Sequence, residues 1–323
     1  MTAQSVRAQG VRGLPGRAWA SSRPLTFVGG AMLLVLGAAL IGVLLDPRVI
    51  TGAPAWLKPM KFAISISIYC FTLLWLLTFV RGRPRLVGFI AWATAIALFV
   101  EMVLIVGAAA LGATSHFNVS TPLHAAVWGT MGASIVLVWV MNLLTAVLLL
   151  FQRLPDPAFA WALRLGLVVS LVGMGVAFLM TNPTAGQMAA AEAGEGMTVA
   201  GAHSVGVEDG GPGLPITNWS TTGGDLRVPH FVGLHGLQAL PLAGFLLAIF
   251  SPGWLRPGHR TALVWTAGLS YLGLVLLLTW QALRGQPVIS PDAQTLGALF
   301  ALLIAAGTIA FMVVLRAWKG RRA

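Results

Sequence analysis

Eight apolar stretches recur along this chain, each near or above the roughly 20 residues that a helix needs to cross the hydrocarbon core of a membrane. They occupy residues 25–45, 62–80, 86–110, 124–151, 157–182, 230–250, 261–283 and 293–315. Apolar residues make up 57% of the chain and charged residues 9%, against roughly 25% charged residues in soluble proteins. Since helices satisfy their own backbone groups inside lipid, we expect an all-α, polytopic membrane helix bundle of about eight transmembrane helices.

The positive charges are distributed unevenly between the two sides of this bundle. With a cytoplasmic N-terminus, fifteen of the twenty Lys and Arg residues fall on the cytoplasmic side. The other five are Arg48, Lys58, Lys61, Arg227 and Arg284. Because cytoplasmic loops carry an excess of Lys and Arg, we expect both termini in the cytoplasm. The net charge of +11 then reflects topology, so we expect membrane lipids and no nucleic acid as partners.

The domain organisation follows from the same pattern. We expect a flexible basic cytoplasmic arm at residues 1–24, a single transmembrane domain at 25–316 and a basic cytoplasmic tail at 317–323. Residues 183–229 form one long outer loop, and a loop of this length is either functional or disordered. A small anionic ligand or a periplasmic partner is expected there, and the stretch with Trp219 is expected to fold back over the helix ends. The bias toward arginine over lysine is typical of GC-rich bacterial genomes and favours an inner (plasma) membrane location.

Three ionisable side chains within or beside the apolar stretches are candidate ligands of a metal or haem. His235 and Glu101 are expected at similar depths in the outer leaflet, and His124 at the head of the fourth span. Imidazole and carboxylate groups together suit Fe, Zn or Cu, and two imidazoles suit a b-type haem. No HExxH, CxxCH or paired ExxH spacing supports one choice. A buried hydrogen-bonded network, or handling of protons or substrate, explains the same residues.

A second group of residues suits an anion or a polar substrate. Lys58 and Lys61 lie at the expected outer start of the second helix, where free N–H groups and the helix dipole attract anions. Contact of both lysines with lipid phosphates is the alternative. The other candidate residues at this mouth are Arg227, Asp225, His230, His116, Asn118 and Gln238.

The tract from Gly224 to Gln238 links these two groups. Asp225 and Arg227 can pair there, or Arg227 can help the lysines to hold an anion. His230 and His235 are five residues apart, so they cannot face one ligand from a regular helix. Gln238, three residues after His235, can share its face.

Three segments carry a resemblance: Trp56–Phe62 (WLKPMKF), Ser115–Asn118 (SHFN) and Gly224–Gln238 (GDLRVPHFVGLHGLQ). Over roughly residues 46–240 the chain resembles a group of uncharacterised multi-pass bacterial membrane proteins. That resemblance implies no substrate, cofactor or fold beyond a multi-pass membrane protein. The leading hypothesis is therefore a membrane redox component that binds haem or a metal. The alternatives are a small-anion or proton-coupled permease, and a sensor or assembly factor that uses the long loop.

Overall fold

The computed structural model describes residues 14–321 and contains eight helices that are long and apolar enough to span a membrane. The sequence prediction of about eight helices of this kind is confirmed. The spanning helices are α3 (Arg23–Leu45), α4 (Leu57–Leu77), α5 (Pro84–Leu111), α6 (Pro122–Leu150), α7 (Pro157–Met180), α9 (Arg227–Phe250), α10 (Pro257–Leu283) and α11 (Ala293–Lys319). The orientation of the termini stays a prediction.

Proline and short polar residues mark where several of these helices begin. Pro84, Pro122 and Pro157 occupy the first helical turn, where the missing N–H group costs nothing. The side chain of Asp156 accepts a hydrogen bond from the Phe159 N–H group and so caps α7. These local signals account for the agreement between the expected and observed spans.

Contacts within the chain divide it into two compact units. The first unit comprises residues up to 48, 54–113 and 130–145. The second unit comprises residues 49–53, 114–129 and 146 onward, so both units include parts of α6. The single transmembrane domain at residues 25–316 stays a prediction.

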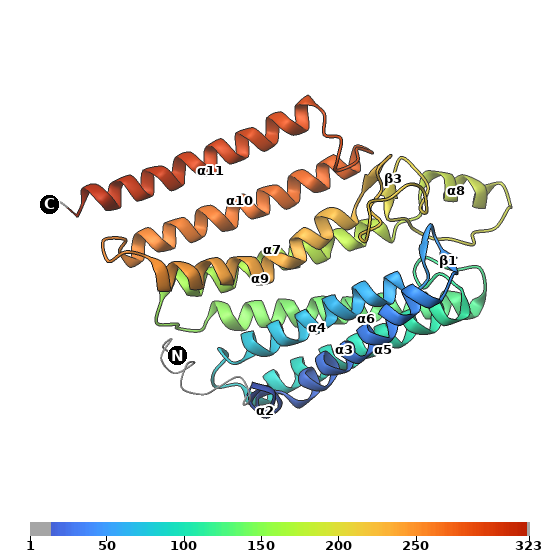
Figure 1. Ribbon diagram of the computed structural model, residues 1–323, viewed down its shortest axis with the longest axis horizontal. Helices are drawn as coiled ribbons and strands as arrows, with labels where there is room; N and C mark the ends of the chain where they lie inside the picture. The colour runs from blue at the N-terminus through green and yellow to red at the C-terminus, as the bar shows by residue number, and fades with distance from the viewer. Residues whose placement is uncertain (1–13, 322–323) are drawn as a thin grey trace. The chain divides into compact units, whose positions relative to one another are not determined.

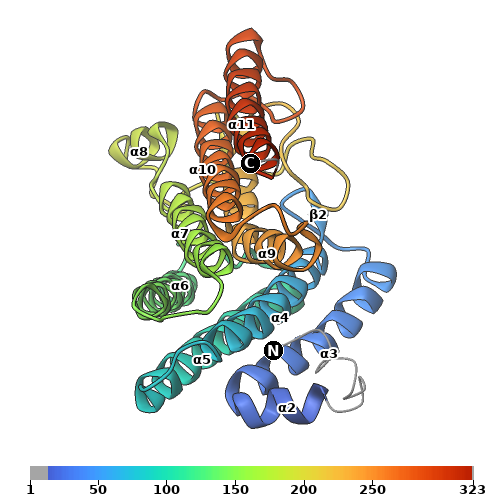
Figure 2. The same ribbon diagram turned by 90° about the vertical axis from the view of Figure 1, so that its left-hand side faces the viewer.

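In the first unit, α3 packs against both α4 and α5, and these two helices also contact each other (Figure 2). A short helix, α2 (Leu14–Ser21), precedes α3 and contacts it. Of the predicted basic arm, residues 1–13 lie outside the described residues, as do residues 322–323 of the predicted tail. The flexibility of the arm remains a prediction.

In the second unit, α7 and α9 pack along each other, α10 contacts both, and α11 packs against α10 (Figure 1). Two glycines lie where α7 and α9 meet: a Cβ atom added to Gly173 would lie 2.5 Å from the Gly233 Cα atom. Such a distance leaves no space for any side chain between the two backbones. The glycines therefore determine how closely α7 and α9 pack.

The long loop between α7 and α9 is folded along much of its length. It contains helix α8 (Ala185–Glu192) and strands β3 (Ser204–Val205) and β4 (Gly224–Asp225), which pair antiparallel. Strand β4 also contacts α10, near its C-terminal end at Ala282. We call this end of the second unit the loop end. A separate hairpin of β1 (Val49–Ile50) and β2 (Ala53–Pro54) precedes α4.

Candidate functional site

A cluster of aromatic and imidazole rings lies at the loop end of the second unit. The Phe117 ring contacts Trp128 edge-on at a centroid distance of 5.0 Å and His203 at 4.8 Å. The His116 ring lies 5.4 Å from that of Trp128. Phe117 is 5% exposed and has φ +62°, an unusual backbone conformation for a bulky residue. The surrounding packing thus holds a strained residue at the centre of this cluster, as is common at functional sites.

His203 is paired with a carboxylate from its own loop. Its Nδ1 atom lies 2.7 Å from Asp209 Oδ2, and the backbone N–H groups of His203 and Ser204 also donate to this carboxylate. Burial acts to raise the pKa of Asp209, but the hydrogen bond and charge of His203 and the backbone donors hold it well below its usual range. Sequence reasoning missed this pair because residues in an irregular loop follow no helical or strand period.

His230 is bonded across to a neighbouring helix. Its Nδ1 atom lies 2.8 Å from the carbonyl oxygen of Gly173 in α7. A carbonyl can only accept, so the proton is on Nδ1 and the Nε2 atom carries the lone pair. The Leu226 N–H group donates to the His203 carbonyl oxygen at 3.0 Å, and the His230 N–H group donates to the Leu226 carbonyl oxygen at 3.2 Å, so both histidines are bonded to the same residue at the start of α9.

The two predicted haem ligands of this unit have a similar arrangement. His124 Nδ1 lies 3.1 Å from both Ser120 Oγ and Thr121 Oγ1. His235 Nδ1 lies 3.3 Å from Gln238 Oε1. The prediction that Gln238 shares a helix face with His235 is confirmed.

All five histidines at the loop end therefore engage a neighbour through Nδ1, since His116 Nδ1 lies 3.1 Å from Ser115 Oγ. A histidine that binds a metal usually donates from its other ring nitrogen to a carboxylate, a backbone carbonyl or a water, which fixes the ring orientation. His203 and His230 show this arrangement most clearly, because their acceptors are a carboxylate and a carbonyl. The loop end thus has imidazoles with oriented Nε2 atoms.

Asp225 and Arg227 form a two-point ion pair at the start of α9. Arg227 Nε lies 2.9 Å from Asp225 Oδ1, and an Arg227 terminal nitrogen lies 2.6 Å from Oδ2. Arg227 also donates to the carbonyl oxygen of Asn218, and Asp225 is 2% exposed. The pairing predicted from the sequence is confirmed, while a role of Arg227 in binding an anion stays a prediction.

Asn118 has a local structural role beside this cluster. Its Oδ1 atom accepts from the backbone N–H and the hydroxyl group of Ser120, and its backbone forms a bridge with Val199. These bonds join the start of α6 to the long loop. A contact between Asn118 and a ligand stays a prediction.

Glu101 belongs to the first unit. It is 1% exposed in α5, and Lys58 near the start of α4 acts electrostatically on it. Lys61 lies one turn further along α4. The predicted convergence of Glu101 with His124 and His235 would join residues of two units and stays a prediction. Within residues 14–321, no three His, Cys, Asp or Glu side chains form a group that could hold a metal ion.

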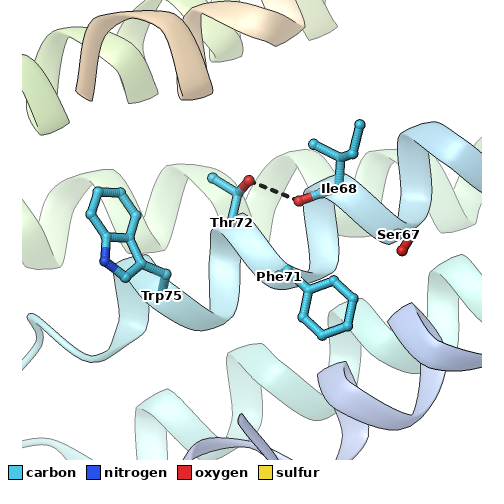
Figure 3. A pocket seen from close by; sticks show the side chains of 5 residues that line it. All are labelled: Ser67, Ile68, Phe71, Thr72 and Trp75. Atoms are coloured by element: carbon cyan, nitrogen blue, oxygen red, sulfur yellow. Dashed lines mark hydrogen bonds between the residues drawn. The ribbon is translucent and has the colours of Figure 1, made fainter. Parts of the chain in front are cut away.

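A shallow, open depression runs along one face of α4 (Figure 3). The Thr72 hydroxyl group donates to the Ile68 carbonyl oxygen at 2.8 Å, so it is bonded within the helix. The residues that line the depression are Ser67, Ile68, Phe71, Thr72 and Trp75. This mainly apolar surface, in the middle of a spanning helix, suits a lipid chain better than a polar substrate.

Comparison of the chain with protein-family models, curated proteins and solved structures finds no match.

Proposed function

We propose that this multi-pass membrane protein is a redox component that binds a transition metal, as an ion or as the iron of a haem, through histidines at the loop end. The charge distribution predicts that this end faces the periplasm of a bacterial inner membrane. The observation that carries the proposal is the shared use of Nδ1 by His203 and His230. Asp209 and the Gly173 carbonyl hold these two rings through Nδ1, so Nε2 would be the atom that coordinates the metal.

The chemistry of the donors limits the metal. Neutral imidazole suits Fe, Cu and Zn, of which Fe and Cu exchange single electrons. Two imidazoles leave coordination positions for water, a substrate or a haem macrocycle. His124 and His235 are the alternative pair.

The experiment is an absorption spectrum and a metal analysis of the full-length protein, purified without added metal. We expect a Soret band, or bound Fe or Cu, which is lost in the paired variant His203→Ala/His230→Ala. If the iron belongs to a haem held by His124 and His235, the corresponding double variant loses it instead. His259→Ala is the matched control, because residue 259 lies at the opposite end of α10, roughly 35 Å along the helix from Ala282.

Two outcomes would refute this proposal. One is a folded protein that contains no metal and binds neither added Cu²⁺ nor haem. The other is equal loss of metal from the His259→Ala control and from both double variants, which would indicate nonspecific binding.

A proton-coupled permease is the second candidate, and the buried Glu101 in the first unit favours it. A carboxyl group inside a membrane span is costly, and such groups commonly mark proton or ion pathways. Proton uptake into proteoliposomes would test this candidate, with Glu101→Gln as the variant that abolishes uptake. Exposed Glu192→Gln is the control, and equal uptake by the two variants would contradict the role of Glu101.

A further inference from the structure

A tight hairpin lies in the long loop just before α9. Gly213 and Ser220 pair across it, and the Leu214 N–H group donates to the Trp219 carbonyl oxygen at 2.8 Å. At the tip, the Thr217 N–H group donates to the Pro215 carbonyl oxygen at 2.7 Å. These short-range bonds define a compact turn, which we call hairpin 213–220.

Two residues of hairpin 213–220 adopt a backbone conformation that L residues rarely adopt. Ile216 has φ +67° and Asn218 has φ +54°. For a β-branched residue a positive φ is a clear outlier and persists only where the surroundings enforce it. The effect at Ile216 is to leave its side chain 71% exposed at the tip.

The base of the hairpin is attached to the first turns of α9. Arg227 donates to the Asn218 carbonyl oxygen at 2.6 Å, and the Ser220 N–H group donates to buried Asp225 at 2.8 Å. The Trp219 ring contacts the Phe231 ring edge-on, at a centroid distance of 6.1 Å. Since Phe231 is four residues inside α9, the Trp219 ring at the base of the hairpin contacts the helix about 6 Å along its axis from Arg227.

This position is the depth at which the apolar part of a spanning helix enters the membrane. Tryptophan is enriched at that interface because its ring suits the headgroup region. An apolar side chain displayed there from a fixed turn has lipid, and not open water, as its natural surroundings. The ion pair of Asp225 and Arg227, to which the base of the hairpin is bonded, holds the turn in place.

We propose that hairpin 213–220 inserts the Ile216 side chain into the phospholipid leaflet on the loop side and so anchors the long loop to the membrane. The partner is the headgroup and upper acyl-chain region of that leaflet, and the insertion does not depend on metal binding. The anchor holds the loop segment that joins the imidazole cluster to α9. Amphipathic segments that lie in this interface reach about 5–10 Å into it.

The test uses the full-length protein carrying Ile216→Cys, labelled with a polarity-sensitive nitrobenzoxadiazole group. The single native cysteine, Cys70, is 0% exposed, so the labelling is specific. The labelled protein is placed in vesicles of phosphatidylethanolamine and phosphatidylglycerol. Glu208→Cys, an exposed charged position in the same loop, is the matched control.

We expect the probe at position 216 to show blue-shifted emission, strong quenching by lipids with a nitroxide on the upper acyl chain, and protection from aqueous iodide. The probe at position 208 is expected to show the reverse. Equal iodide quenching at both positions would overturn the proposal, because Ile216 would then lie in water. Protection of position 216 from both quenchers would also overturn it, because the tip would then contact protein. Since Ile216 packs against little, a thermal-unfolding midpoint equal to that of the unmodified chain verifies that the labelled variant is folded.

Discussion

The packing of α7 against α9 is expected to fail when a single methyl group is added at Gly173. A Cβ atom there would lie 2.5 Å from the Gly233 Cα atom and 2.6 Å from its carbonyl carbon. Both obstructing atoms are backbone atoms, so no side-chain rotation relieves the clash. The two helices must separate by roughly 1 Å to restore an ordinary carbon contact of about 3.5–4.0 Å.

The cost of Gly173→Ala has two parts. Overpacking of this kind costs about 1–3 kcal/mol. Separation of the helices also lengthens the 2.8 Å bond from His230 Nδ1 to the Gly173 carbonyl oxygen, and losing that bond costs about 0.6–1.5 kcal/mol. Alanine itself gains about 1 kcal/mol over glycine inside a helix, so we expect the free energy of unfolding to fall by about 1–3 kcal/mol in total.

Gly175→Ala provides the matched control on the same helix. Apart from its chain neighbours and the backbone of its own helix, no atom lies within 4 Å of the position that its Cβ atom would take. Alanine is favoured over glycine inside a helix by about 1 kcal/mol, so this variant should be neutral or more stable. Unfolding in detergent, followed by tryptophan fluorescence, measures both variants. If Gly173→Ala unfolds at the same midpoint as Gly175→Ala, the close approach of α7 and α9 is wrong.

Three further perturbations test the loop end. Asp225→Asn should lower the free energy of unfolding by about 1.5–3 kcal/mol, because Arg227 loses a charged, two-point partner; an unchanged thermal midpoint would contradict this. The depressed pKa of Asp209 contributes stability that is present above the unfolded value of about 3.9 and is lost as the pH falls through the folded value. Pepsin should therefore cut the loop of the native chain faster as the pH falls below about 4. The loop of the Asp209→Asn variant should be cut quickly at every pH tested. A variant as resistant as the native chain would argue against the His203 pair. Gly52→Ala should lower the free energy of unfolding by about 1–3 kcal/mol, because residue 52 has φ +69° and its new Cβ atom would lie 2.3 Å from the Gly210 carbonyl oxygen. Unchanged hydrogen exchange of residues 207–213 in this variant would count against the contact.

Local contacts could be predicted where both partners lie on one regular element or beside each other in sequence. His235 and Gln238 are three residues apart on α9, and Asp225 and Arg227 are two residues apart where that helix begins. A helical period or a short separation determines such pairs, so the sequence alone is sufficient. The residues that would bind a ligand are far apart in the sequence, so neither a helical period nor a short separation predicts which of them meet.

The sequence by itself determined the eight spans, because length, hydropathy and proline positions act along a single segment. Only the tertiary structure decided that Gly173 meets Gly233, that His230 reaches the Gly173 carbonyl oxygen and that His203 pairs with Asp209. Glycine has no side chain to signal its partner, and an irregular loop has no period that places one residue opposite another. Inside a membrane, apolar faces also differ little in their preference for lipid or protein, so packing shape and a few hydrogen bonds select the neighbours.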